Sequence, residues 1–245
     1  MLWPDVVDLK QFYASPTGQM AAGCIRRRVQ GVWPSVAGES LLGIGFATPF
    51  LLPYLGEAER VLACMPAAQG VIHWPVTQEN LTFLADEAEL PLADNSVSRI
   101  ILAHALEHSE LVRALLQEVW RVLTPTGKVI VLVPNRTGIW ARSPGSPFSL
   151  GTPFTAWQLK SLLFEQRLTP LATQRALFFP PLKTRFVLRA SRVMDEVGAR
   201  ICPGLSGVIL MEAEKQLYAP GLVGRVRGRQ RIYRPTGAPA MTLQR

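Results

Sequence analysis

Three residues near the middle of the chain have the types and the spacing of a metal-binding motif. His104, Glu107 and His108 lie within the string HALEH, which has the order H-x-x-E-H. Two imidazoles and a carboxylate can bind Zn²⁺, and in this motif they converge because residues four apart share one face of a helix. Here the string follows a predicted strand at 97–103 and precedes an amphipathic helix. We therefore predict a strand–helix junction in which the imidazoles do not share a face, and no bound metal.

A second candidate site lies where the apolar run Leu41–Gly45 ends. The residues of interest there are Gly43, Gly45, Phe46 and Ala47. A nucleotide-like ligand needs the backbone to pass close beside it, which residues without bulky side chains permit. A short Gly-x-Gly also fits a tight strand-to-helix turn that binds nothing. Both interpretations stay open on these residues alone.

Polar residues follow two further predicted strands. Asp86 and Glu87 come after the run 81–85, and Asn135 and Arg136 come after the β-branched run at 128–133. Ligands of open parallel sheets lie outside the carboxyl ends of the strands. Arginine can hold an anionic or carbonyl group with two parallel hydrogen bonds, so we predict that Asn135 and Arg136 bind a substrate. The alternatives are an acidic surface turn for the first pair and a loop anchor for the second.

The elements that must position these residues alternate between strands and helices. Apolar residues at spacings of four and three predict an amphipathic helix that contains Leu111, Leu115, Val119 and Val122 and ends at the break 124–127. Further helices are predicted at 5–31, broken near Ser15, after a capping box at Thr155, and at 186–200. Strands are predicted at 41–45, 60–65, 81–85, 97–103, 128–133, 168–179 and 206–216. This alternation predicts an α/β fold with a parallel sheet covered on both faces.

Residues 40–220 resemble the class I S-adenosylmethionine (SAM)-dependent methyltransferases of the type 11 kind, most specifically between Leu81 and Arg136. That stretch contains the acidic loop ADEAELP, followed by DNS, and the helix and strand described above. The resemblance implies a doubly wound, mostly parallel seven-stranded sheet, a Rossmann-like methyltransferase fold whose last strand is antiparallel. It also implies SAM as the cofactor.

The resemblance assigns roles to individual residues. Gly45 and Ala47 match the glycines of the family's first loop, with Phe46 between them, and Asp86, beside Glu87, matches the acid that binds the adenine amino group. Two acids of the family's cofactor site are missing: Gly43 stands in place of one, and Met65 stands in place of the acid that binds both ribose hydroxyls. A thioether cannot replace a carboxylate that accepts two hydrogen bonds.

The function that follows is SAM-dependent methyl transfer to an unidentified acceptor. His104, at the end of a strand, would face the SAM methionine or the acceptor and is the candidate catalytic base; a histidine that merely begins a helix is the alternative. The substitutions at Gly43 and Met65 favour a second function, a non-catalytic methyltransferase-like subunit that binds a partner protein.

Composition sets the remaining expectations. The 245 residues divide into a helical lead-in (1–38), a methyltransferase-like domain (39–220) and a basic tail (221–245), which we expect to be disordered and which carries six of the net eight positive charges. Binding of nucleic acid is expected only through this tail, if at all. Three scattered cysteines, acids near the N-terminus and no long apolar run indicate a cytoplasmic protein without a membrane span.

Overall fold

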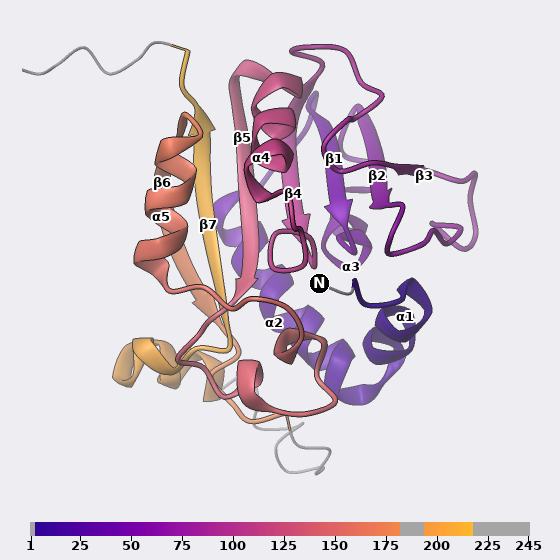
Figure 1. Ribbon diagram of the computed structural model, residues 1–245. Helices are drawn as coiled ribbons and strands as arrows, with labels where there is room; N and C mark the ends of the chain where they lie inside the picture. The colour runs from indigo at the N-terminus through magenta and orange to yellow at the C-terminus, as the bar shows by residue number, and fades with distance from the viewer. Residues whose placement is uncertain (1–2, 182–193, 218–245) are drawn as a thin grey trace, which may run out of the picture.

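The chain folds around a seven-stranded sheet with the order β3-β2-β1-β4-β5-β7-β6 (Figure 1). The computed structural model describes residues 3–181 and 194–217. The strands are β1 (Ser40–Gly45), β2 (Arg60–Pro66), β3 (Thr82–Ala85), β4 (Val97–Ala103), β5 (Leu123–Pro134), β6 (Leu168–Ala176) and β7 (Val208–Lys215). β1 to β5 pair in parallel, whereas β7 pairs antiparallel with both β5 and β6. The predicted doubly wound sheet with an antiparallel last strand is confirmed.

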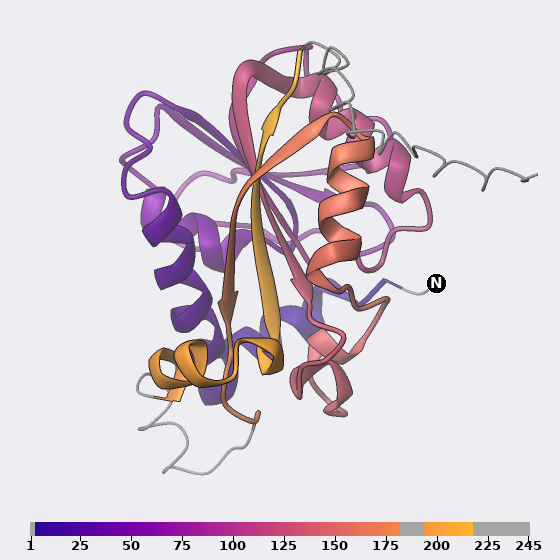
Figure 2. The ribbon, with the colours of Figure 1, turned by 90° about the vertical axis from the view of Figure 1, so that its left-hand side faces the viewer.

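Helices cover both faces of this sheet (Figure 2). One face packs against α2 (Pro16–Val32) and α3 (Thr48–Leu51), and the other packs against α4 (Val112–Val122) and α5 (Ala156–Glu165). Successive strand residues enter opposite layers, as the two-residue period of a strand requires. Short 3₁₀ helices lie at η1 (Leu52–Tyr54), η2 (Trp140–Arg142), η3 (Pro147–Ser149) and η4 (Pro203–Leu205).

The N-terminal lead-in forms two helices that break where the sequence predicts. Asp5 caps α1 (Val6–Ala14) by accepting a hydrogen bond from the backbone N–H of Val7. Ser15 caps α2, and Pro16 occupies its first turn, where the missing N–H has no cost. α1 does not lie on either face of the sheet. It lies beyond the carboxyl ends of the strands (Figure 1), which places it at the candidate site.

The structure corrects two predicted boundaries. β5 begins at Leu123, so the predicted break at 124–127 belongs to the strand. β6 ends at Ala176 instead of residue 179, because Leu177 turns to φ +65° and Asp195 accepts hydrogen bonds from the backbone N–H groups of Leu177 and Phe178. Residues 194–201 are helical, whereas the rest of the helix predicted at 186–200 and the whole tail at 221–245 lie outside the described residues. No helix in the described ranges is long and apolar enough to cross a bilayer.

Candidate active site and an adjoining histidine–glutamate cluster

The centre of the site is the turn at Gly45, between the carboxyl ends of β1 and β4. Gly45 has φ +80°, and a Cβ at this position would clash with the carbonyl oxygen of Ala103 and lie 3.0 Å from that of His104. Only glycine is free of strain at such a φ and in such a contact. The tight turn predicted for this residue is therefore a steric requirement of the fold, whatever the turn binds.

The two positions at which family acids are missing both lie in apolar surroundings. A Cβ at Gly43 would lie 2.6 Å from Leu51 Cδ1 and 2.8 Å from Ala47 Cβ, so no acidic side chain fits there. Met65, at the end of β2, is fully buried in the layer that contains α2 and α3. Apolar side chains therefore fill the space around both positions.

The other two residues of the predicted loop, Phe46 and Ala47, are also buried, and Phe46 is covered by α1. The Tyr13 ring stacks on Phe46 with centroids 5.6 Å apart and an interplanar angle of 10°. The Tyr13 hydroxyl lies 2.7 Å from His104 Nε2, in a buried hydrogen bond whose direction depends on the histidine tautomer. α1 thus contacts the ends of β1 and β4 at once.

A second contact fixes the beginning of α1 over the end of β2. The backbone N–H of Val6 donates to the carbonyl of Gln69 at 2.9 Å. Gln69 is buried, and its Nε2 donates to the carbonyl of His104 at 3.2 Å. One cavity of about 470 Å³ is bordered by Tyr13 and Phe46, and another of about 680 Å³ is bordered by Phe12 and Ser143. Through these contacts α1 covers the carboxyl ends of β1, β2 and β4.

Asp86 and Glu87 lie at the end of β3, as predicted, and remain partly open to solvent. Asp86 is exposed, and its Oδ1 accepts from the backbone N–H of Ala88 at 2.8 Å. Glu87 is half-buried, and its Oε1 accepts from the Ser109 hydroxyl at 3.5 Å. Burial first and then the charge of Glu87 raise the pKa of the Cys64 thiol to about 12. Of the residues predicted to bind the cofactor, Asp86 and Glu87 are the two with polar side chains.

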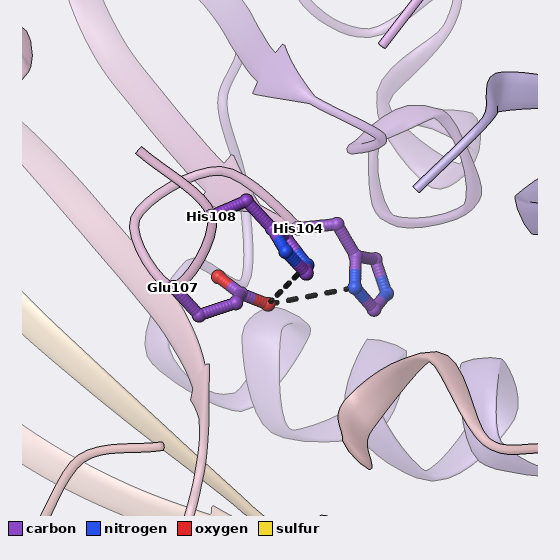
Figure 3. A group of neighbouring side chains, drawn as sticks. All are labelled: His104, Glu107 and His108. Carbon is purple, nitrogen blue, oxygen red and sulfur yellow. Dashed lines mark ion pairs between the residues drawn. The ribbon is translucent and has the colours of Figure 1, made fainter. Parts of the chain in front are cut away.

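His104, Glu107 and His108 form a compact cluster directly after β4 (Figure 3). One carboxylate oxygen of Glu107 lies 3.5 Å from His104 Nδ1 and 3.9 Å from His108 Nε2. The string is not helical, as predicted, so its imidazoles share no helical face, yet the ligand atoms of the three residues lie within 4.8 Å of one another. His104 adopts φ +51°, and the next four residues make a single turn closed by hydrogen bonds from the N–H groups of residues 108 and 109 to the Ala105 carbonyl. The left-handed conformation of His104 and the turn after it reverse the chain direction and bring the two imidazole rings together.

All three side chains of the cluster are at most 2% exposed. Burial lowers the pKa of His108 below 6.5, with Glu107 raising it and His104 lowering it to a smaller extent. The His108 ring is therefore neutral near pH 7. For Tyr13, burial and then the charge of Glu107 raise the pKa well above 10, so its hydroxyl keeps its proton.

The two predicted substrate residues, Asn135 and Arg136, follow β5 and make hydrogen bonds to neighbouring loops. Asn135 is buried, and its Nδ2 donates to the carbonyls of Gly204 and Ser206 and to the Ser206 hydroxyl. Arg136 is exposed, and its guanidinium donates to the carbonyl of Pro153. Both side chains thus hold loops, the alternative that the sequence left open, and their substrate role stays a prediction.

Sequence reasoning missed Tyr13 and Gln69. Val6, Leu9 and Tyr13 are the buried residues of α1, with spacings of three and four that mark one helical face. That spacing predicts that α1 packs on something, but not that it packs on the strand ends. Gln69 follows β2 in a segment without periodicity, so no local signal identifies it.

Comparison with known proteins supports the family assignment. Residues 42–131 match the family described as "Methyltransferase domain". A SAM-dependent methyltransferase from Thermotoga maritima superposes with a TM-score of 0.61 at 14% identity, covering 86% of this chain and 96% of that one. The Haloferax volcanii complex between the Trm112 methyltransferase activator and a methyltransferase gives 0.58 at 14% identity, covering 79% and 89%. A Mesorhizobium loti SAM-dependent methyltransferase gives 0.54 at 17% identity, covering 77% and 96%. No curated protein matches the chain.

Proposed function

Because the chain belongs to the class I SAM-dependent methyltransferase superfamily by its matched domain and its fold, we propose that it transfers the methyl group of SAM to an acceptor once α1 has moved off the crevice. The observation that carries this proposal is the methyltransferase-domain match over residues 42–131, which includes both the Gly45 turn and Asp86. At that turn the backbone of β1 reaches the end of β4 without a side chain between them, beneath α1. A cofactor of this size needs such a close approach to the backbone.

The residues present fit the cofactor in part. Asp86 would accept from the adenine amino group, and the small residues Gly45 and Ala47 would let the cofactor lie against the backbone. Met65 offers no acceptor for the ribose hydroxyls, and the crowding around Gly43 excludes an acid there. Since a charge-assisted hydrogen bond contributes about 1.5–3 kcal/mol, we expect binding that is specific but weak.

Bound SAM would supply an electrophilic methyl group on a positively charged sulfur, and the protein would supply orientation and exclusion of water. α1 is suited to exclude water because its buried face already seals the strand ends. His104 Nε2 is occupied by Tyr13 while α1 is closed. In an open conformation this nitrogen would face the crevice and would take a proton from an acidic acceptor.

Calorimetric titration with SAM and S-adenosylhomocysteine tests the proposal. We expect saturable binding to the full chain, weakened several-fold in Asp86→Asn because the neutral amide is a poorer acceptor. The matched control is Glu89→Gln, a neutral substitution in the same turn. Formation of S-adenosylhomocysteine from SAM in the presence of acceptor candidates, reduced in Asp86→Asn, then tests the transfer itself.

A second candidate function is a non-catalytic subunit that binds a partner protein. The observation that favours it is the apolar filling around Gly43 and Met65, which removes two polar cofactor contacts at once. One of the similar structures is a complex between the Trm112 methyltransferase activator and a methyltransferase, so the fold is compatible with a bound protein partner. Calorimetry of the wild type and of Tyr13→Phe, which should loosen α1, distinguishes the two functions. If neither protein binds SAM or S-adenosylhomocysteine at millimolar concentration, the result favours the non-catalytic subunit over methyl transfer.

A further inference from the structure

Three potential metal ligands meet in the cluster formed by His104, Glu107 and His108, directly after β4. One ligand atom from each residue lies within 4.8 Å of the other two. Figure 3 shows the Glu107 carboxylate directed toward both rings. Two imidazoles and one carboxylate form a donor set typical of divalent transition metals.

The cluster is buried and its polar atoms lack partners. Among the described residues, seven buried side-chain nitrogen and oxygen atoms have no hydrogen-bond partner, and four of them belong to this cluster: His104 Nδ1, Glu107 Oε2 and both ring nitrogens of His108. The distances of 3.5 and 3.9 Å from Glu107 Oε1 to the imidazole nitrogens are too long for hydrogen bonds. Buried polar groups are normally satisfied, so this concentration calls for a missing partner.

The spacing matches what a metal ion requires. Bonds of about 2.0–2.2 Å to a tetrahedral ion place its ligand atoms about 3.4 Å apart. The 3.5 Å from Glu107 to His104 is close to this value, the 3.9 Å from Glu107 to His108 exceeds it by about half an ångström, and the ligand atoms of all three residues lie within 4.8 Å of one another. Binding of an ion would therefore draw the three side chains closer together.

The surroundings support the same assignment. Tyr13 lies 2.7 Å from His104 Nε2, which leaves Nδ1 as the ligating atom and fixes the orientation of the ring, as a partner outside the coordination sphere commonly does. Phe148 lies 5.0 Å from the His104 ring, and Trp3 lies 5.8 Å from the His108 ring, so aromatic groups exclude water. His104 holds φ +51°, a conformation that costs about 1 kcal/mol or more in a non-glycine residue and that clusters at functional sites.

We propose that His104 Nδ1, His108 Nε2 and the Glu107 carboxylate bind one divalent transition-metal ion of the Zn²⁺ class, with the fourth position left to water or another ligand. The charge of the ion compensates the buried Glu107 carboxylate, and the unpartnered nitrogens become ligands. A ring that ligates through Nδ1 keeps its proton on Nε2, so metal binding would replace the proton-accepting role proposed above for His104, and the Zn²⁺ measurement below decides between the two roles.

Metal binding to untagged full-length protein tests this inference. The protein is unfolded and refolded with equimolar Zn²⁺, desalted, and analysed for metal content; Co²⁺ serves as a spectroscopic probe of the geometry. We expect about one ion per chain in the wild type and a melting temperature that EDTA lowers. His108→Gln and Glu107→Gln, which keep the shape of the side chains, should each weaken Zn²⁺ binding by at least about 100-fold, since loss of partners beyond the ligands alone costs 10–100-fold.

The chain provides a matched control in His73, the histidine outside the cluster, which is exposed. His73→Gln should bind Zn²⁺ like the wild type. Melting of all variants in EDTA distinguishes lost ligation from lost folding. A wild type that binds no stoichiometric Zn²⁺ or Co²⁺ would overturn the inference and restore the metal-free expectation from the sequence. Equal binding by all variants would also overturn it, because the ion would then lie elsewhere.

Discussion

Removing one hydroxyl group should loosen α1 and tighten cofactor binding. The Tyr13 hydroxyl makes a buried hydrogen bond with His104 Nε2, and this bond joins α1 to the end of β4. Tyr13→Phe keeps the ring that stacks on Phe46 and removes only that bond. The proposed function requires α1 to leave the crevice before SAM enters, so weakening the closed conformation increases the fraction of molecules that can bind.

The size of the effect follows from the burial of both partners. A buried nitrogen left without its hydrogen-bond partner costs about 1–2 kcal/mol. If this cost falls on the closed conformation alone, the apparent affinity for SAM or S-adenosylhomocysteine rises by at most about 5–30-fold. The same loss should lower the melting temperature by roughly 2–8 °C for a chain of this size.

Calorimetric titration with S-adenosylhomocysteine and thermal melting in EDTA measure the two effects on one protein. The control is Tyr54→Phe. Tyr54 is 1% exposed, and its hydroxyl donates to the carbonyl of Trp33 at 2.9 Å, outside α1. This variant should lose similar stability and bind the ligand like the wild type.

The opposite pattern would refute the gating role of α1. If Tyr13→Phe melts lower but its dissociation constant equals that of the wild type and of Tyr54→Phe, opening of α1 does not limit binding. If both variants bind more tightly to the same extent, the gain comes from general loosening of the fold.

Met65→Asp should tighten SAM binding by about 1–3 kcal/mol through a restored ribose acceptor, and should lower stability because Met65 is fully buried. Calorimetry measures the affinity and thermal melting measures the stability, with Met65→Asn as the control for charge. Unchanged affinity would contradict the alignment of Met65 with the ribose-binding acid. The hydrogen bonds from Arg121 to both carboxylate oxygens of Glu118, at 2.8 Å each, lower the pKa of Glu118 below 4.5. The stability from this pair is therefore complete above about pH 4.5 and lost as the pH falls through the lowered pKa; urea unfolding from pH 6 to about pH 3 should show a shallower loss in Glu118→Gln. Deleting residues 221–245 should leave the melting temperature within about two degrees, because such a segment buries little apolar surface. The deletion should also weaken salt-sensitive binding to acidic partners or nucleic acid, and unfolding on truncation would contradict this.

Local patterns predicted most of the elements because each depends on few neighbours. The spacing of Leu115, Val119 and Val122 produced α4, since one apolar stripe is enough to place a helix on a sheet. The capping box at Thr155 was found with both of its hydrogen bonds. The ends of β5 and β6 were less predictable, because neighbouring strands and the carboxylate of Asp195 decide where pairing stops.

The sequence by itself determined the order of strands and helices and the residues at the carboxyl ends of the strands, because two-residue and 3.6-residue periods and turn residues act over short distances. It also determined that acids are missing at Gly43 and Met65. Only the tertiary structure decided that α1 lies over those ends, 91 residues separating Tyr13 from its partner His104. Only the tertiary structure brought His104, Glu107 and His108 together, because a left-handed backbone conformation at His104 depends on the packing around it and leaves no periodic signal in the sequence.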